Sequence, residues 1–595
     1  MTIAIFISFL WHYQTYTFLS FTLTFLGAIS SAVMLYMVFY ILLFIFSFSK
    51  TLILYLSMAL FVITDITLIT DFFIYKLFHF HINAMVLNIL TSPDALDSIQ
   101  AGIVPVFISI FLLIGFIFLE FKLLKTIETY GENKRVKLNT KLNRFIILPF
   151  IIIILTEKIS FGMATLFSKN ELIVPFKVIP LYQPLTFNKL AAKHFGLKAE
   201  KQAQFSIKTH SDLNYPLKPI VLDNRSIGFP IFIIASDSVT YGAINQELTP
   251  NLMHFSKDAL VFKHHYSGGN STRFGIFSLM YGLNSSYWFS FLNSNQKPIL
   301  FDILQKRDYN ISIISSTNTN WPEFRKTCYV NIQNKIQDHF DGEPWKKDAQ
   351  STNCFIAQLS NKDKKIFSFI FLDSPHGYSY PPSDNIYQAE SGEVNYLAIT
   401  KESKELDTVK KRYKNAVHYN DILFGKMIAA LKKQKLYEKS LIIYTSDHGQ
   451  EFFEQGNFGH NTAFSEPQIH IPLLMKLPKP LQDKINFSQI NNSLTSHQDI
   501  VPTLLTLLGV ENNTTEYSNG FNFFDPHFHH DYVFSSNWNN NAIVTKDTIS
   551  VFSNLPNKIF NNEVHDRQSY KILQHKNTQS NYLLDVIKEN KKFLK

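Results

Sequence analysis

The first 49 residues of this 595-residue chain contain no Asp, Glu, Lys or Arg. Apolar runs follow whose lengths approach or exceed the roughly 20 residues that a helix needs to cross a bilayer. They cover about 20–48, 51–75, 103–121 and 145–166. Core helices of water-soluble proteins seldom run this long without charge. Residues 1–166 are therefore predicted to form an α-helical transmembrane domain.

Basic residues set the expected orientation of these spans. The segment 122–144 is rich in Lys and Arg and holds only two acidic residues, Glu128 and Glu132. The positive-inside rule places such a segment in the cytoplasm. The next span would then carry the rest of the chain to the opposite side of the membrane.

Two features of the membrane part leave alternatives open. Residues 1–11 are apolar but too short to span, so they are either the second half of a helix whose start is missing or the outside end of a four-span protein. Asp65 lies deep in a predicted span, where an acid is costly; helix packing and transport both remain open for it. Asp71 lies nearer the outer end of the same span.

Residues 167–228 are predicted to be a linker. A helix-like run from Thr186 contains Lys189, Lys193 and Lys198, which either touch lipid headgroups or form a solvated helix. The formal net charge of +9 comes without a dense basic stripe, so no nucleic-acid partner is expected. An oxidising compartment permits a disulfide between the only two cysteines, Cys328 and Cys354.

From residue 229 to 595 the pattern becomes alternating strand and helix. Apolar strands such as "FPIFIIAS", "KIFSFIFL" and "SLIIYTS" alternate with helical segments, the longest at 403–436. Continuous apolar strands of this kind are typical of a parallel sheet covered by helices on both faces. The fold class expected is thus a transmembrane helical domain followed by an α/β domain.

Polar residues follow several of these strands. Asp237 ends the first strand, His376 follows another, and Asp447 and His448 end a third. In "SGGNST", glycines precede Ser271 and Thr272 at the start of a helix, where an anion is favoured. Because ligands of parallel α/β sheets bind beyond the carboxyl ends of the strands, we expect these groups to share one site.

Several of these motifs occur in the order found in the alkaline-phosphatase/sulfatase superfamily, which residues 229–510 resemble. They are "IIASDSVT", "SGGNSTRFGIFSLMYGL", "TSDHGQEF" and "SHQDIVPTLLTLLG". The resemblance implies metal ligands at Asp237, Asp447 and His448. It also implies a nucleophile hydroxyl at Thr272, with Ser271 as the alternative.

Three motifs extend over nearly the full length of the chain: "FHFHINAMVLNILTSPD", "PLYQPLTFNKLAAKHFG" and "SGGNSTRFGIFSLMYGL". Through them the chain also resembles the PbgA/YejM family of Gram-negative inner-membrane proteins. This resemblance implies five spans, a linker and a periplasmic sulfatase-like domain in a multi-pass inner-membrane protein. Some members of that family are thought to sense lipopolysaccharide and control lipid A synthesis through an inner-membrane regulatory partner.

The residues after the nucleophile depart from true sulfatases, which carry Cys or Ser followed by x-Pro-Ser-Arg. Here Arg273, Phe274 and Gly275 follow Thr272, which argues against a formylglycine sulfatase. His376 and His460 match histidines that contact the phosphate or the leaving group in the phosphoethanolamine-transferase branch. An imidazole ligand suits zinc or manganese, with magnesium and calcium as alternatives.

Two functions follow from these residues. The first is a metal-dependent hydrolase or phosphotransferase that acts on phosphoesters of envelope lipids, with Thr272 attacking phosphorus and His376 or His460 protonating the leaving oxygen. The second is a non-enzymatic sensor of lipopolysaccharide or anionic phospholipid that regulates lipid A synthesis and outer-membrane homeostasis.

Overall fold

A computed structural model describes most of the chain, and the description below concerns those residues. They are 1–13, 16–78, 80–83, 86–87, 103–134, 140–167, 169–187, 213–224, 228–360, 365–482, 490–554, 563–573 and 582–595. The described chain falls into two compact units, one containing residues up to 187 and the other those from 213 onward. Each unit is described by itself.

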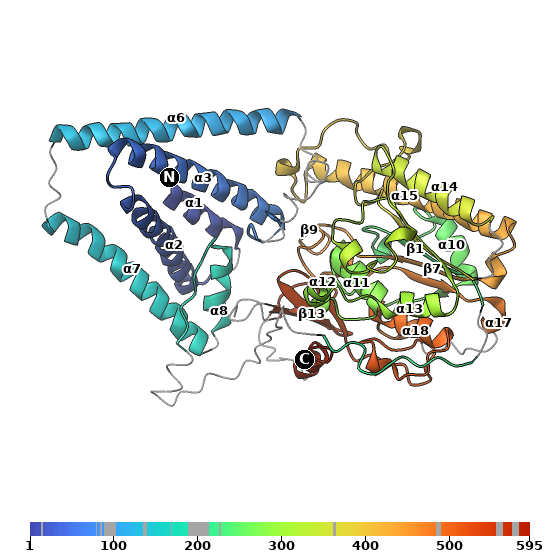
Figure 1. The fold of residues 1–595 in the computed structure, drawn as a ribbon. Helices are drawn as coiled ribbons and strands as arrows, with labels where there is room; N and C mark the ends of the chain where they lie inside the picture. The colour runs from blue at the N-terminus through green and yellow to red at the C-terminus, as the bar shows by residue number, and fades with distance from the viewer. Residues whose placement is uncertain are drawn as a thin grey trace. The chain divides into compact units, whose positions relative to one another are not determined.

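The first unit consists of helices (Figure 1). They are α1 (Thr2–Ser8), the 3-10 turn η1 (Phe9–His12), α2 (Phe18–Phe44), α3 (Lys50–Phe78), α6 (Ile103–Lys134) and α7 (Thr140–Leu166). Thr17 caps α2, since its side chain accepts the backbone N–H of Ser20. Within the described residues, three helical stretches are long and apolar enough to cross a membrane: α2, α3 and residues 147–166 of α7.

The basic segment 122–144 is mostly helical, although we predicted it as a loop between spans. Helix α6 contains the predicted span 103–121 and continues to Lys134, and α7 starts at Thr140, ahead of its apolar stretch. Hydropathy marks only the part of a helix that suits lipid. Lys and Glu also have a high helix propensity in water, so both helices extend beyond their apolar stretches.

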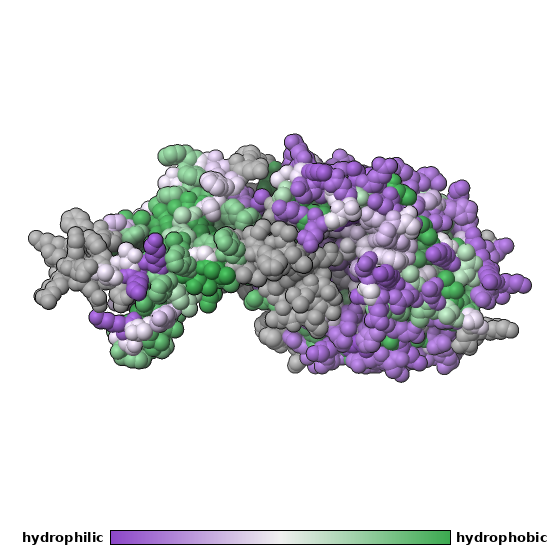
Figure 2. All heavy atoms as spheres, turned by 90° about the horizontal axis from the view of Figure 1, so that it is seen from above, coloured by the Kyte–Doolittle hydropathy of each residue, from purple (hydrophilic) through white to green (hydrophobic). Residues whose placement is uncertain are grey.

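Large apolar side chains are exposed on the first unit, where Figure 2 shows hydrophobic atoms gathered on its surface. Phe18 is 90% exposed and Phe111 is 77% exposed. A surface of this kind in water would expose far more contiguous apolar area than soluble proteins tolerate. It is the surface that a bilayer would cover, whereas the second unit presents mostly hydrophilic residues (Figure 2).

The two acids of α3 are buried and bonded. Asp65 accepts a hydrogen bond from the Thr2 hydroxyl of α1 at 2.7 Å, so it links two helices. Asp71 lies 2.7 Å from His81 Nδ1 and accepts the backbone N–H of Ile82. The His81 ring also reaches the carbonyl of Lys177 at 3.0 Å. Both acids therefore join segments within this unit, and Asp71 does not simply reach the membrane interface.

The predicted linker 167–228 is described in two stretches. Helix α8 (Asn170–Ile173) and the turn η2 (Val174–Val178) pack in the hydrophobic core of the first unit. Residues 213–224 belong to the second unit, where Leu213 forms an isolated bridge to Leu594 and Leu222 one to Val510. The basic run with Lys189, Lys193 and Lys198 lies outside the described residues.

A seven-stranded sheet in the order β2-β10-β7-β1-β6-β4-β5 forms the centre of the second unit. The strands are β1 (Ile231–Ser236), β2 (Leu260–Val261), β4 (Asn310–Ser315), β5 (Ile336–Gln337), β6 (Ile366–Leu372), β7 (Leu441–Ser446) and β10 (Leu473–Lys476). The strands β7, β1, β6, β4 and β5 are mutually parallel, as predicted.

The sheet is mixed rather than wholly parallel, because β10 runs antiparallel to both β7 and β2. A connection between two parallel strands needs a crossover, which carries the chain back to the end of the sheet where the first strand began. Between β7 and β10 the chain forms only a short hairpin and the one-turn helix α16 (Glu466–Ile469). It stays at the carboxyl end of β7, so the next strand must run back.

Helices cover both faces of the sheet (Figure 1). Ile231, Ile233 and Ala235 of β1 pack in one core with α11 (Thr272–Tyr281), α13 (Ile299–Lys306) and α18 (Ile500–Leu507). Phe232 and Ile234 point to the other core, with α10 (Pro250–Phe255), α14 (Pro344–Gln358) and α15 (Lys404–Lys433). Alternate residues of one strand thus enter two cores, which explains the continuous apolar run.

We did not predict a second sheet, and we left a disulfide open. A second, antiparallel sheet contains β12 (Val533–Ser536), β13 (Asn540–Val544), β14 (Thr548–Ser553) and β15 (Glu563–Asp566). The permitted disulfide is absent: Cys328 is buried as a free thiol, and Cys354 is a second free thiol whose sulfur hydrogen-bonds Gln337.

Candidate metal centre

Strand register brings the two acidic loop residues together. Strands β1 and β7 are parallel neighbours, and Ser236 pairs with Ser446 at their carboxyl ends. Asp237 and Asp447 are the next residue on each strand, so their side chains leave the sheet side by side. Both are at most 3% exposed.

Thr272 reaches the same point from the first position of α11. Its Oγ1 lies 3.3 Å from Asp237 Oδ2 and 3.2 Å from His448 Nε2. Gly275 permits this approach, because a Cβ atom there would lie 2.1 Å from the backbone oxygen of Asp447. The hydroxyl of Ser271 is buried without a hydrogen-bond partner, so among these two hydroxyls only Thr272 contacts the cluster.

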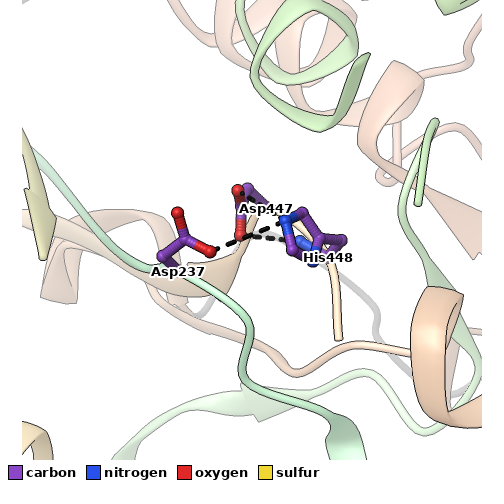
Figure 3. Close-up of side chains that lie close together, drawn as sticks. All are labelled: Asp237, Asp447 and His448. Carbon is purple, nitrogen blue, oxygen red and sulfur yellow. Dashed lines mark hydrogen bonds and ion pairs between the residues drawn. The ribbon is translucent and has the colours of Figure 1, made fainter. Parts of the chain in front are cut away.

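The cluster of Asp237, Asp447 and His448 fits a divalent cation. Their ligand atoms all lie within 4.8 Å of one another, and Figure 3 shows the three side chains converging. His448 Nε2 is 3.4 Å from Asp447 Oδ2 and 3.5 Å from Asp237 Oδ1. Ligand atoms about 2.0–2.1 Å from a tetrahedral zinc ion lie about 3.3–3.4 Å apart. The separations of 3.4 and 3.5 Å between His448 Nε2 and the two carboxylates therefore match those around a zinc ion.

The histidine tautomer suits a ligand. The Nδ1 atom of His448 lies 2.9 Å from the carbonyl of Gly449, which can only accept, so Nδ1 carries the proton. Its Nε2 lone pair therefore faces the cluster. Burial lowers the pKa of His448, and the imidazole is neutral at neutral pH.

The charges in the cluster are unbalanced without a cation. Burial raises the pKa of Asp447 well above its usual range, and the adjacent Asp237 carboxylate raises it further. Asp447 Oδ2 is buried and has no hydrogen-bond partner. An orphaned carboxylate oxygen beside a second carboxylate is costly, and a bound cation removes that cost.

Two further histidines border the cluster. His376 follows β6, its Nδ1 lies 3.5 Å from Asp237 Oδ1, and its side chain is 43% exposed. His460 follows the hairpin strand β9 (Phe458–Gly459), and its ring centroid is 4.4 Å from that of His448 and 5.1 Å from that of His376. The structure therefore gathers all six predicted site residues at one edge of the sheet.

Electrostatics distinguish these two rings. Burial lowers the pKa of His460 well below its usual value, and the neighbouring His448 lowers it further. For His376, burial also lowers the pKa, but the Asp237 carboxylate outweighs it and the net shift is upward. His460 is thus the neutral ring and His376 the protonated one in the absence of a cation.

Arg273 points away from the cluster although it follows Thr272 directly. Its guanidinium forms a 2.7 Å ion pair with Glu323 and lies 4.6 Å from the centroid of the Trp538 ring and 5.4 Å from that of Trp288. Only 5% of the residue is exposed. It contributes to packing behind the helix start.

Sequence reasoning missed the residues that hold these loops. Gln450 Oε1 lies 2.8 Å from His460 Nδ1, and the buried Asp348 accepts the backbone N–H groups of Asp373 and Ser374. Glu451 accepts several hydrogen bonds inside the loop. Gln450 and Glu451 lie in the "DHGQEF" motif, but spacing alone does not distinguish a supporting side chain from a turn residue.

Comparison with known proteins gives matches over both units. A family model described as sulfatase matches residues 230–510, and one described as a domain of unknown function matches residues 7–222. The inner membrane protein YejM of Salmonella typhimurium is 23% identical over 540 residues, which cover 89% of this chain and 83% of YejM.

Two further matches cover less. An uncharacterized protein of Haemophilus influenzae is 28% identical over 377 residues, which cover 62% of this chain and only 56% of that relative. The crystal structure of the C-terminal periplasmic domain of EcEptC from Escherichia coli is 19% identical. It covers 57% of this chain and 96% of that domain, with a TM-score of 0.44.

The family models and the YejM match confirm the predicted resemblance, the fold class and the inner-membrane localisation with a periplasmic C-terminal domain. The divisions at residues 166 and 228, the site roles, the metal and the partners remain predictions.

Proposed function

Since the chain is a YejM-like inner-membrane protein with a sulfatase-family periplasmic domain, we propose that it is a metal-dependent hydrolase or transferase of envelope-lipid phosphoesters. The observation that carries the proposal is the contact of Thr272 Oγ1 with both Asp237 and His448. A hydroxyl at the first turn of a helix, beside a buried cation site, is an arrangement suited to nucleophilic attack.

Asp237, Asp447 and His448, with the Thr272 hydroxyl as fourth ligand, would hold zinc or manganese. When bound, such an ion lowers the pKa of a ligated hydroxyl and neutralises charge that develops on phosphate oxygens. The mixed carboxylate and imidazole set favours these metals over calcium, which prefers oxygen ligands.

The chain's own residues account for the bonds and protons of the transfer. The Thr272 hydroxyl gives its proton to Asp237 Oδ2, 3.3 Å away, as its oxygen forms the bond to phosphorus. The bond from phosphorus to the lipid alcohol breaks, and that oxygen takes a proton from His376, while the neutral His460 ring lies beside His376. Water or a second lipid alcohol then attacks phosphorus and gives its proton to His376, and the Thr272 oxygen leaves with the proton held by Asp237, which regenerates the hydroxyl.

The experiment is turnover of a phosphodiester by the full-length protein in detergent, after EDTA treatment and reloading with Zn²⁺ or Mn²⁺. Thr272→Ala should lower kcat at least about 100-fold, because the nucleophile is lost, and Thr272→Ser should keep measurable activity. Intact mass after rapid acid quench should show the phosphoryl group with its remaining ester substituent on wild type and not on Thr272→Ala.

A competing result would shift the assignment. If Ser271→Ala abolishes turnover while Thr272→Ala does not, the nucleophile is Ser271. If wild type turns over neither a generic phosphodiester nor phospholipids of the inner membrane with any of these metals, the enzyme proposal fails.

A lipid-sensing function is the second proposal, favoured by the construction of the membrane unit. A simple anchor needs no buried acids, yet Asp65 and Asp71 are buried and bonded to other segments. We infer that this unit responds to lipopolysaccharide or anionic phospholipid and acts on an inner-membrane protein partner. Crosslinking through photoreactive residues in α3 should capture such a partner, and an empty crosslinking map would reject this proposal.

A further inference from the structure

Glu451 is a buried carboxylate in the segment that joins two site histidines. It opens β8 (Glu451–Phe452), three residues after His448, and is 0% exposed. In the described part of the chain no Lys, Arg or His forms an ion pair with it. A buried charge without a cation is retained only where hydrogen bonds satisfy it.

Four neutral donors satisfy Glu451. Its Oε1 accepts the backbone N–H of Gln455 at 2.9 Å and that of Asn457 at 2.8 Å. Its Oε2 accepts the Ser465 hydroxyl and, at 3.1 Å, the side-chain amide of Gln468. One oxygen therefore holds the tip of the β8–β9 hairpin, and the other holds the segment around α16.

The second of these segments is fixed further by Gln468. Its Oε1 accepts the backbone N–H groups of Thr462 and Ala463, and its backbone carbonyl accepts the N–H of Gly449. The Asn270 side chain donates to the carbonyl of Ala463 at 2.7 Å. Hydrogen bonds thus connect the chain on either side of His460 both to Glu451 and to the loop before Thr272.

The metal-ligand cluster is held differently. Asp237 and Asp447 follow strands whose register is fixed by the central sheet, and Thr272 lies on a packed helix. His460 follows a two-residue strand in a two-stranded hairpin, which is marginal without added contacts. Loss of the Glu451 hydrogen bonds would therefore displace His460 and leave Asp237, Asp447 and Thr272 in place.

We propose that Glu451 is a positioning residue that holds the neutral His460 ring within hydrogen-bonding distance of the leaving oxygen. This inference rests on the proposed phosphotransfer function. Its consequence is selective: a hydrogen bond to the leaving oxygen matters greatly for a poor leaving group and little for a good one.

The test compares two phosphodiesters with the zinc-loaded full-length protein, one releasing p-nitrophenol and one an alkyl alcohol. For Glu451→Gln we expect kcat/KM to fall more than 10-fold with the alkyl substrate and less than 3-fold with the p-nitrophenyl one. Exposed Glu511→Gln is the matched control and should change neither. Equal losses on both substrates would overturn the proposal.

A double variant tests whether Glu451 acts through His460. His460→Gln should show the same selectivity, and Glu451→Gln/His460→Gln should fall no lower than His460→Gln alone. Multiplying losses would mean that the two residues act separately. If Glu451→Gln does not fold, Ser465→Ala serves in its place, because it removes only one hydrogen-bond donor. It should lower kcat/KM for the alkyl substrate too, by a smaller factor.

Two readouts do not depend on turnover. In Glu451→Gln, amide hydrogen exchange of residues 449–468 should accelerate at least 10-fold while that of α11 stays unchanged. Zinc affinity should stay within 3-fold of wild type. If wild type has no activity, the proposed function fails. The exchange pattern still decides whether Glu451 holds the segment 449–468. Unchanged exchange in Glu451→Gln would show that it does not.

Discussion

At the residue scale, the metal centre shows how buried charge is tolerated only with its counterion. Asp237 and Asp447 face each other at the ends of neighbouring strands, and Asp447 Oδ2 has no partner. A buried charge without a partner commonly costs several kcal/mol of folding stability. The two facing carboxylates thus lower the stability of the metal-free protein, and a bound metal ion stabilises the fold.

Asp447→Asn should have opposite effects in the two forms. In EDTA we expect its thermal midpoint to rise by a few degrees above wild type, because one of two facing carboxylates is removed. With excess Zn²⁺ the wild-type midpoint should rise and the variant's should not, because ligand binding stabilises only the form with an intact site. Differential scanning fluorimetry measures both, with exposed Asp547→Asn as control; a zinc-induced rise in Asp447→Asn would contradict this.

At the scale of elements, the site depends on how closely α11 approaches β7. Gly275 faces the backbone oxygen of Asp447, with room for a hydrogen but not for a methyl group. Backbone atoms on a central strand cannot move aside as a flexible side chain can. The helix must therefore shift if any side chain is added there.

Gly275→Ala is expected to lower the free energy of unfolding by about 1–3 kcal/mol, the usual cost of overpacking. It should also lower turnover, because Thr272 moves with the helix. Gly242→Ala is the control, since a Cβ atom there meets nothing within 4 Å. Chemical denaturation and the phosphodiester assay give the two readouts, and equal stability of both variants would argue against the close approach.

A second element contact predicts a pH dependence. Asp499 lies at the turn before α18. Its carboxylate accepts hydrogen bonds from His530 Nε2, at 2.9 Å, and from the backbone N–H of Phe521. Burial lowers the pKa of His530, but Asp499 outweighs it and the net shift is upward from 6.5. A raised folded-state pKa gives stability that is complete below pH 6.5 and is lost as pH rises through the folded value.

His530→Gln should therefore lower the thermal midpoint most at pH 6, and its effect should shrink as the pH is raised from 6 towards 9, because the ion pair's contribution is lost as the pH passes the raised pKa of His530. Thermal melts of both proteins across this range, in EDTA to exclude effects of the metal site, provide the measurement. A difference between them that stays constant or grows with pH would show that the ion pair does not stabilise the fold.

At the scale of the whole molecule, the spans and the basic segment 122–144 predict which side of the membrane each part occupies. A reporter inserted between Lys134 and Thr140 should be active in the cytoplasm. The same reporter fused after Lys595 should behave as periplasmic. Paired alkaline-phosphatase and green-fluorescent-protein fusions at both places measure this, and a periplasmic signal from the first would reverse the topology.

Prediction from the sequence succeeded where one residue and its neighbours determine the outcome. Three of the four apolar runs coincide with described helices that are long and apolar enough to cross a membrane, and strand ends located Asp237, Asp447 and His448. It failed where distant residues decide. The direction of β10 depends on the path of residues 447–472, and the support that Glu451 gives to the loop depends on Ser465 and Gln468 folding back onto it. Neither leaves a periodic trace in the sequence.

The two unbonded cysteines also bear on how the periplasmic part matures. Cys328 is sealed in the core and Cys354 hydrogen-bonds Gln337, so the fold contains no covalent crosslink. Secretion of this domain therefore places no demand on the oxidoreductases that install disulfides in newly exported chains. Its yield should be the same in cells lacking that machinery, and the folded domain should be equally attainable in a reducing cytosol.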